Sequence, residues 1–357
     1  MPEKKRVAVL FGGHSTEYGV SLQSAASVLE HLDRERFEAV PIGIARQGGW
    51  YLYRGPVQAV RDDAWQRDEF CTPVVLSPSR GGPALLSLED GAPRGITVDA
   101  AFPVLHGKDG EDGTVQGLFA LAGVPLVGCG VLASALCMDK ARAHKLVQAE
   151  GIRVPRSFSH QRPYCAREVL QEADGLGYPL FVKPVRSGSS YGVSRVETAR
   201  DLLPAVERAF AHDDTVLLEE AIPGREVGCA VLGNGELALG EVDEIELQGG
   251  FFDFSEKYTL KTARIHVPAR LPASAADRVR AVAARVYRIL ACQGFARVDL
   301  FYTPEGEIVF HEVNTIPGFT SHSRFPRMMQ AAGWSLKQVL TAAIDLALRC
   351  GADCGEV

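Results

Sequence analysis

The 357-residue sequence lacks features that mark several other classes of protein. No apolar run is long enough to cross a membrane, and residues 7–11 are too few for the core of a signal peptide. The eight cysteines form no C-x-x-C pair, so a zinc ribbon has no support and we expect a reducing, cytoplasmic location. Repeats and low-complexity tracts are also absent. Lys and Arg number 38 against 44 Asp and Glu, so neither nucleic acid nor a membrane is an expected partner.

The composition is that of a globular enzyme, with 46% hydrophobic and 23% charged residues, and the length implies two or three domains. An apolar strand at 7–11 ends in two glycines and precedes a helix with an apolar stripe, for which we expect Ser21 as the N-cap. This order of elements predicts an α/β fold. Further strands are predicted at residues 100–105, 124–128, 180–184 and 215–219, a hairpin at 226–242, and helices at 196–211 and from Ser274 onward.

A second predicted hairpin carries acidic residues on one face. Its strands are residues 296–303 and 308–314, joined by a turn at 304–307. Because side chains alternate along a strand, Arg297 and Asp299 share a face, as do Glu312 and Asn314. The expected cross-strand pairs are Thr303–Ile308, Asp299–Glu312 and Arg297–Asn314.

Two carboxylates therefore face each other across the hairpin. At ~4 Å and an effective dielectric of ~20 their repulsion is about 4 kcal/mol, more than the ~0.2–1 kcal/mol of a favourable cross-strand pair. We expect a positive charge between them, and all-oxygen ligands suit Mg²⁺ or Mn²⁺. The alternative is an exposed acidic sheet face. Apolar residues beside the acidic ones favour a strand pair in the core.

A glycine- and serine-rich loop at residues 186–192 follows the strand that carries Lys183. Its backbone N–H groups and hydroxyls are suited to phosphate oxygens, although the loop is not a Walker A motif and a flexible surface loop is the alternative. A second glycine motif, residues 128–133, fits the dinucleotide fingerprint G-x-G-x-x-A, with Glu150 downstream. It leaves an NAD-dependent dehydrogenase as a distant alternative.

The segments FGGHSTEYGVSLQSA, FPVLHGKDGEDGTVQGLFALAGVPLVG, LFVKPVRSGSSYGVS, EKYTLKT, ARVDLF and HEVNTIPGFTSHSRFP together resemble the D-alanine–D-alanine ligase family. They run in order from residue 11 to about residue 326. The resemblance implies the ATP-grasp fold, an α/β fold of three domains with ATP held between the central and C-terminal domains. The implied domains are residues 1–130 with the first D-alanine subsite, 131–214 with the phosphate loop, and 215–357 with the Mg-binding hairpin.

The resemblance also implies a reaction and its residues. ATP phosphorylates the carboxylate of D-alanine, and a second amine attacks the acyl phosphate. The nucleotide positions are Lys140, Phe181, Lys183, Ser189, Ser190, Glu219, Glu220, Ala221, Ile222, Glu226 and Lys257. The substrate and catalytic positions are Glu17, His106, Ser189, Tyr258, Arg297, Gly318, Ser323 and Arg324. Two Mg²⁺ ions are expected on Asp299, Glu312 and Asn314.

Individual roles follow from the same resemblance. Glu17 holds the ammonium of the first D-alanine and Ser189 orients Glu17. Arg297 and the Gly318 N–H stabilise the oxyanion, while Ser323 and Arg324 meet the second carboxylate. Residues 250–258 form a lid, in which Lys257 reaches phosphate and Tyr258 lies near Ser189. The alternatives are a helix-start acid for Glu17, a structural histidine for His106 and surface lysines for Lys140 and Lys183.

The second substrate depends on finer features. Relatives that use D-lactate replace the pair Lys257-Tyr258, which is intact here, so an amine nucleophile is expected. The segments TEYGVSLQSA, FFDFSEKYTLKT, WYLYRG and TSHSRFP look like those of vancomycin-resistance D-alanine–D-serine ligases. We therefore expect D-serine, with a second D-alanine as the alternative. A homodimer is expected from the resemblance, and a non-catalytic ATP-grasp module is disfavoured by the complete set of acidic and arginine positions.

Overall fold

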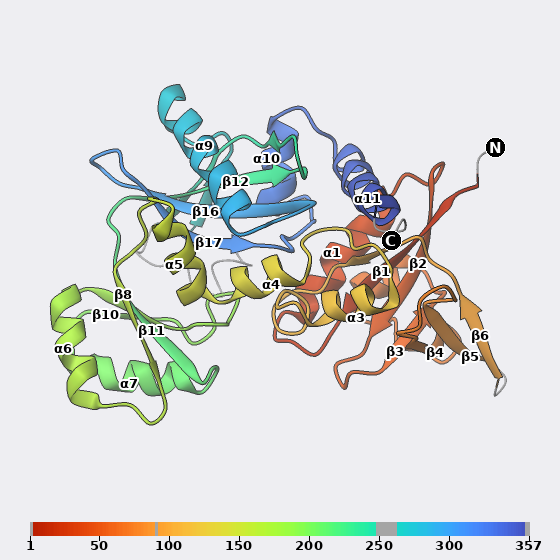
Figure 1. The fold of residues 1–357 in the computed structure, drawn as a ribbon, viewed down its shortest axis with the longest axis horizontal. Helices are drawn as coiled ribbons and strands as arrows, with labels where there is room; N and C mark the ends of the chain where they lie inside the picture. Colours follow the sequence, from red (N-terminus) through yellow and green to blue (C-terminus); the bar gives the residue numbers. More distant parts are fainter. Residues whose placement is uncertain (1–2, 90–91, 248–262, 354–357) are drawn as a thin grey trace.

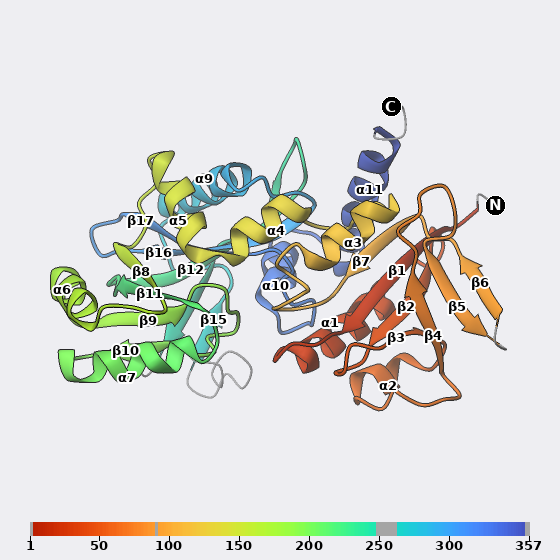
Figure 2. The ribbon, with the colours of Figure 1, turned by 60° about the horizontal axis from the view of Figure 1, so that its bottom comes forward.

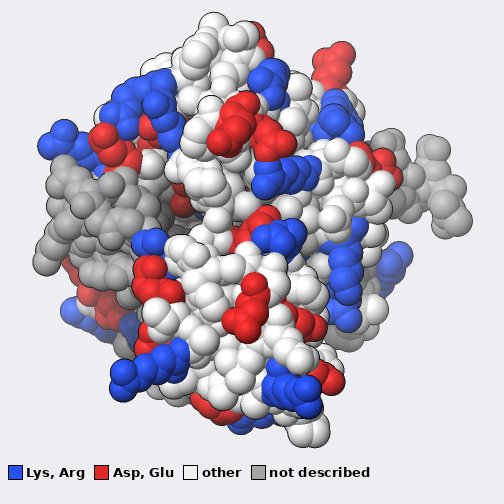
Figure 3. Space-filling view, turned by 90° about the vertical axis from the view of Figure 1, so that its left-hand side faces the viewer, with Lys and Arg blue, Asp and Glu red and all other residues white. Residues whose placement is uncertain are grey.

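The computed structural model describes residues 3–89, 92–247 and 263–353. The chain forms three β-sheets with helices packed on them, arranged along the long axis of the molecule (Figure 1). No helix of these ranges is long and apolar enough to cross a membrane. On the face shown in Figure 3, basic and acidic side chains are interspersed.

The first sheet has seven strands in the order β6-β5-β4-β3-β2-β1-β7. The strands are β1 Lys5–Gly12, β2 Phe37–Ile44, β3 Trp50–Tyr53, β4 Cys71–Leu76, β5 Leu85–Glu89, β6 Ala92–Ile96 and β7 Ala100–Pro103. Its helices are α1 Tyr18–His31, α2 Val57–Arg61 and α3 Thr114–Ala122. β1 lies parallel to β2 and β7, and residues 7–11 are fully buried, which is typical of a parallel strand covered on both faces. The predicted strand at 124–128 is wrong, because only Leu126 forms an isolated bridge, to Ala101.

Helix α1 begins earlier than predicted. Glu17 is its N-cap, and Ser21 lies inside the first turns. The Ser21 hydroxyl instead accepts a hydrogen bond from the Gly12 N–H at 2.8 Å and donates to the Val104 carbonyl. The serine therefore joins α1 to the ends of two strands rather than capping the helix.

The second sheet has four strands in the order β10-β9-β11-β8. Its elements are β8 Ser157–Gln161, α6 Ala166–Leu176, β9 Leu180–Pro184, β10 Ser194–Val196, α7 Ala199–Phe210 and β11 Thr215–Glu220. Leu180, Val182, Val216 and Leu218 pack against α6 and α7 on one face (Figure 2). Because side chains alternate, Lys183 and Glu219 lie on the opposite face. Helices α4 Val131–Met138 and α5 Lys140–Ala149 connect the first two sheets.

The third sheet has the order β15-β14-β12-β16-β17, with β13 paired to β12. Its elements are β12 Arg225–Leu232, β13 Ala238–Leu239, β14 Asp243–Leu247, β15 Ala263–His266, α9 Ala273–Ile289, β16 Phe295–Tyr302, β17 Ile308–Asn314, α10 Arg324–Ala331 and α11 Leu336–Asp353. The predicted hairpin at 226–242 is present, with a short second strand. Helix α9 begins after Pro272, so Ser274 is not its cap. Helix α11 returns to pack against α1 in the core of the first sheet. The predicted domain boundaries, after residues 130 and 214, stay a prediction.

The β16–β17 hairpin confirms two of the three predicted pairs. Asp299 lies opposite Glu312, and Arg297 lies opposite Asn314. Tyr302, not Thr303, pairs with Ile308, because a bulge shifts the register between Asp299 and Leu300. The bulged residue is His311, which has no partner in the β16–β17 pairing. It lies between Glu312, which pairs with Asp299, and Phe310, which pairs with Leu300.

Candidate active site

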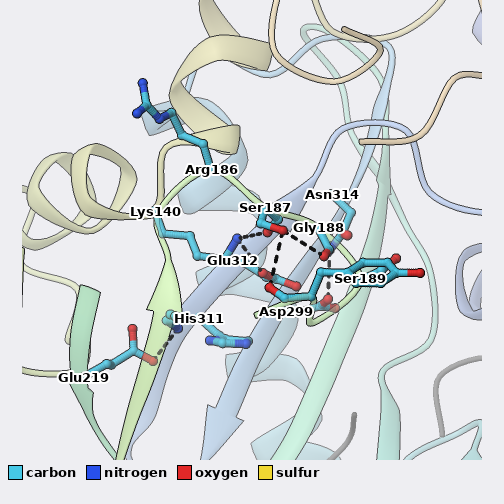
Figure 4. A network of polar contacts seen from close by, with 12 residues as sticks. Lys140, Arg186, Ser187, Gly188, Ser189, Glu219, Asp299, His311, Glu312 and Asn314 are labelled. Carbon is cyan, nitrogen blue, oxygen red and sulfur yellow. Dashed lines mark hydrogen bonds and ion pairs between the residues drawn. The ribbon is translucent and has the colours of Figure 1, made fainter. Parts of the chain in front are cut away.

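Two cavities meet where the three sheets converge. One has a volume of about 880 Å³ and is lined by α1, the loop after β7, and the ends of β16 and β17. The other has a volume of about 910 Å³ and lies between the second and third sheets. Lys140, Ser187, Ser189 and Glu312 line both. A group transferred from a ligand in one cavity to a ligand in the other would pass these four residues, which lie together in Figure 4.

The larger cavity contains the predicted nucleotide positions. Its lining includes Lys140, Phe181, Lys183, Ser189, Ser190, Glu219, Glu220, Ala221, Ile222 and Glu226. At its base the Lys183 ammonium lies 2.6 Å from Glu219 Oε1, and both side chains are buried. Burial alone would raise the pKa of Glu219, but Lys183 and His144 hold it below its ordinary value. Within the described residues, Glu219 Oε2 and His311 Nδ1 are buried without a hydrogen-bond partner, as expected where a polar ligand binds.

The serine-rich loop has an unusual backbone. Ser189 and Ser190 both have positive φ, +49° and +60°, which side chains other than glycine seldom adopt. Such backbone geometry is favoured at ligand-binding loops. The Lys140 ammonium donates to the Ser187 carbonyl at 2.8 Å and lies 3.5 Å from Glu312 Oε2, so it ties the loop to β17. Lys140 is therefore not an exposed surface lysine.

Glu17 points into the smaller cavity. Its side chain makes no capping hydrogen bond to α1 and instead accepts one from the Ser189 hydroxyl. Two glycines leave room for it: a Cβ on Gly107 would lie 2.4 Å from Glu17 Oε2, and one on Gly188 would lie 2.7 Å from the same atom. Glu17 does stand at the start of α1, as the alternative expected, but its carboxylate is bonded to Ser189 and not to the helix N–H groups. An ammonium group is the natural partner for a carboxylate held in this way.

Asp299 lies at the centre of a buried charge network. Its carboxylate accepts hydrogen bonds from Arg297 Nε at 2.8 Å and Nη2 at 2.7 Å, and Arg324 Nη1 lies 3.2 Å away. The Asn314 amide nitrogen donates to it at 2.9 Å. Burial alone would raise the pKa of Asp299, but Arg297 and Arg324 hold it below its ordinary value. Part of the positive charge expected beside the acidic pair is therefore supplied by the protein.

The same oxygens suit a divalent cation. No group of three or more His, Cys, Asp or Glu side chains in the described ranges is arranged to hold a metal. A cation here would use two carboxylates, Asp299 and Glu312, with the Asn314 amide oxygen and oxygens of a bound phosphate, the ligand set typical of Mg²⁺. Because the Asn314 nitrogen donates to Asp299, its oxygen faces the other way. The chemistry of these donors therefore fits the metal, whereas in the present arrangement Asp299 is paired with Arg297 and Arg324.

The end of the smaller cavity beyond Arg297 is rich in polar groups. Thr320 and Ser323 share a hydrogen bond of 2.8 Å between their hydroxyls, and a Cβ on Gly318 would lie 2.6 Å from the Ser323 hydroxyl. Arg324 lines this end, but its guanidinium also makes a two-point pair with Asp243, at 2.6 and 2.8 Å. Arg324 is thus held by β14 as well as facing the cavity.

The structure brings the described site residues together. Glu17, His106, Ser189, Arg297, Glu312, Asn314, Gly318, Ser323 and Arg324 line the smaller cavity. Lys257 and Tyr258 lie outside the described residues. Three neighbours escaped the sequence interpretation: Glu111 beside Glu17, Asp243 beside Arg324, and Ser24 beside His106. Glu111 and Ser24 lie within segments that carry the family resemblance, which could have pointed to them, whereas Asp243 lies outside all of these segments.

Comparison with known proteins agrees with this geometry. The model described as "D-ala D-ala ligase N-terminus" matches residues 6–129, and that described as "D-ala D-ala ligase C-terminus" matches residues 146–345. The chain belongs to the D-alanine–D-alanine ligase family. It is therefore an ATP-dependent ligase that forms a peptide bond between D-amino acids, and the family's fold is ATP-grasp. ATP and a divalent metal are its general cofactors.

Three relatives of this ligase differ in their second substrate. A D-alanine–D-alanine ligase of Caldicellulosiruptor bescii is 43% identical, covering 97% of this chain and 95% of its own. A putative D-alanine–D-lactate ligase of Streptomyces coelicolor is 44% identical, covering 96% and 97%. The crystal structure of the VanG D-Ala:D-Ser ligase from Enterococcus faecalis has 53% identity and a TM-score of 0.90, covering 97% of this chain and 100% of the other.

The dehydrogenase alternative has no support in the ligase. Residues 124–128 do not form a sheet strand before the glycine motif. A Cβ on Gly294 would lie 2.7 Å from the Gly128 Cα, so the motif packs against the protein itself at this point. The fingerprint match at 128–133 is therefore coincidental.

Proposed function

We propose that this ligase joins D-alanine to D-serine and supplies D-Ala–D-Ser to peptidoglycan precursors, which confers resistance to glycopeptides such as vancomycin. The observation that carries the choice is the 53% identity to the VanG D-Ala:D-Ser ligase, against 43–44% to the D-alanine and putative D-lactate ligases above. The intact Lys257-Tyr258 pair supports an amine nucleophile. A second D-alanine is the alternative substrate.

The polar end of the smaller cavity supports a substrate that carries a hydroxyl. Thr320 lies there, beside Ser323 and Arg324, which are proposed below to hold the carboxylate of the substrate. An apolar pocket rejects an added hydroxyl by only ~100-fold, whereas a site built to bind it discriminates by ~10⁴-fold. Polar groups at this end would therefore favour D-serine over D-alanine.

The roles of the residues follow from the two cavities. ATP occupies the larger cavity, on the nucleotide positions named above. Glu17, oriented by Ser189, holds the ammonium of D-alanine, so that its carboxylate lies at the junction beside Lys140 and Glu312. When bound on Asp299, Glu312 and Asn314, two Mg²⁺ ions would neutralise phosphate charge.

The second half of the reaction uses the other end of the smaller cavity. Ser323 and Arg324 hold the carboxylate of the second amino acid. Its amine attacks the carbonyl carbon of the acyl phosphate, and inorganic phosphate leaves as the amine gives up a proton and the peptide bond forms. Arg297 and the Gly318 N–H stabilise the oxyanion that forms. Lys257 and Tyr258, which lie outside the described residues, complete the proposed set.

Two further properties belong to this proposal. The seven described cysteines are all free thiols. The Cys137 and Cys292 sulfurs lie 3.7 Å apart without forming a disulfide, and free thiols at this distance support the proposal of a reducing cytoplasm. A homodimer is proposed from the family resemblance.

Phosphate release from ATP and Mg²⁺, with D-alanine alone or with D-serine added, tests the function. The assay should cover about pH 6 to pH 9, because the attacking amine must be unprotonated. D-serine should raise turnover well above that with D-alanine alone. Equal turnover would support the D-alanine alternative, and no phosphate release dependent on D-amino acids at any pH would exclude the ligase reaction. Glu305→Gln, in the exposed turn of the hairpin, is the control that should retain full activity.

A further inference from the structure

The segment that carries Gly318 is fastened on both sides of that glycine, to the loop after β7 and to helix α1. Before it, the Ile316 N–H donates to Glu111 Oε1 at 3.1 Å. After it, the Phe319 N–H donates to the Ser24 hydroxyl at 3.3 Å, and the Ser27 hydroxyl donates to the Phe319 carbonyl at 2.8 Å. These contacts join residues about 200 to 300 positions apart in the chain, so they fix one part of the cleft relative to another.

Glu111 also reaches the first-substrate side of the cleft. Its second oxygen, Oε2, accepts a hydrogen bond from the Gly107 N–H at 2.8 Å. Gly107 is one of the two glycines against which the Glu17 carboxylate lies. One carboxyl group therefore connects the residue that borders Glu17 with the segment that carries Gly318.

His106 strengthens the same connection. Its Nε2 lies 3.1 Å from the Ser24 hydroxyl, and its ring also contacts the backbone of Ile316. Burial lowers the pKa of His106 to about 4, so the ring is neutral at neutral pH. The Ser24 hydroxyl thus contacts both the Phe319 N–H and His106 Nε2 and links the two.

We propose that Glu111 and Ser24 are positioning residues, which hold the Gly318 N–H in line for the oxyanion and couple its position to the first-substrate subsite. This role rests on the proposed function, in which Gly318 donates to the oxyanion. Neither residue needs to touch the reacting atoms. Misplacing a catalytic group by about 1 Å can cost roughly 100-fold in rate, so loss of the anchors should lower kcat strongly.

Glu111→Gln is the most direct variant, because the amide keeps the shape but can accept only one of the two N–H bonds. We expect kcat to fall by roughly 100-fold. The KM for ATP should stay within about threefold of wild type, since Glu111 does not line the nucleotide cavity. Ser24→Ala should lower kcat less, with the same unchanged KM for ATP. The exposed Glu305→Gln is the matched control, and thermal unfolding of every variant shows whether it is folded.

The double variant tests whether both residues act on one segment. If they do, its loss of kcat will be clearly smaller than the product of the two single losses. The anchoring role is overturned if Glu111→Gln keeps kcat within about twofold of Glu305→Gln, if the KM for ATP changes in parallel with kcat, or if the two losses multiply. A wild-type enzyme without D-alanine-dependent turnover would overturn the proposed function and this role together. An active wild type with a normal Glu111→Gln variant would overturn the anchoring role alone.

Discussion

Replacing Lys183 with methionine would leave a carboxylate buried without its main partner. The Lys183 and Glu219 side chains are only 5% and 3% exposed, and their charged atoms are 2.6 Å apart. Removing one partner of a buried ion pair typically costs about 3–5 kcal/mol, because the other charge remains desolvated. His144 lies 3.8 Å from Glu219 Oε2, but burial lowers its pKa, so it supplies little charge at neutral pH. We therefore expect Lys183→Met to reduce the free energy of unfolding by about 3–5 kcal/mol at pH 7.

The pH dependence of this loss has a definite sign. In the wild type the pKa of folded Glu219 lies below its ordinary value, so its contribution to stability is present at neutral pH and lost in acid. Without Lys183, burial becomes the dominant effect and raises the pKa of Glu219 in the folded variant. As the pH falls, Glu219 of the folded variant is protonated before that of the unfolded chain, and this stabilises the variant. The difference between wild type and Lys183→Met should therefore be largest near about pH 8 and shrink toward about pH 5.

Urea unfolding at both pH values measures this difference. Lys145→Met, on the exposed face of α5, is the control and should change stability by no more than ~0.5 kcal/mol. A loss below about 1 kcal/mol for Lys183→Met, or an equal loss at the two pH values, would refute the reasoning about the buried pair.

Gly188→Ala should crowd Glu17 and raise the KM for D-alanine roughly tenfold, while the KM for ATP stays unchanged. Gly175→Ala is the control, because the space around Gly175 is open. An effect on the KM for D-alanine no larger than that of the control would contradict the prediction. Glu312→Gln should lower kcat by at least about 100-fold and weaken the dependence of turnover on Mg²⁺; unchanged turnover would remove Glu312 from the metal site. Burial, and then Glu17, raise the pKa of Glu111 to about 8, so the folded protein retains a proton that the unfolded chain loses. Stability should therefore fall between about pH 4.5 and pH 8 more steeply in the wild type than in Glu111→Gln. Parallel slopes in urea unfolding would contradict that assignment.

The acidic hairpin shows what alternation along a strand can and cannot predict. Period two placed Asp299 opposite Glu312 and Arg297 opposite Asn314, as the structure has them. The pair at the turn was wrong by one residue, because the bulge at His311 absorbs an extra position and the turn lengthens. A bulge depends on packing and on what the strand must present, and the hydrophobic pattern carries no signal for it.

Charge compensation was harder to predict than the acidic cluster itself. The sequence indicated that positive charge should lie beside Asp299, and the metal was the candidate. The structure adds Arg297 from the same strand and Arg324, which Asp243 holds from β14. Arg324 is 25 residues from Asp299 and 81 residues from Asp243 in the chain, and such partners meet only through the tertiary fold, which periodicity does not specify.

Strands that show a local sequence pattern were predicted well, whereas contacts between distant segments were not. Residues 180–184 and 215–219 are short apolar runs, and their strands place Lys183 and Glu219 in the cleft. The sequence predicted Ser21 and Ser274 as helix N-caps. In the structure the Ser21 hydroxyl donates to the Val104 carbonyl, and Ser274 lies inside the first turn of α9. At Ser21, tertiary hydrogen bonds thus override the local capping preference.

The central claim is that the two adjoining cavities bring ATP and two D-amino acids together to form a peptide bond. Mass spectrometry of the products from ATP, Mg²⁺ and an equimolar mixture of D-alanine and D-serine tests it most directly, with ADP measured in parallel. We expect D-Ala–D-Ser as the main dipeptide, formed in equal amount to ADP. ADP formation without any dipeptide, or no reaction that requires the D-amino acids, would contradict the claim.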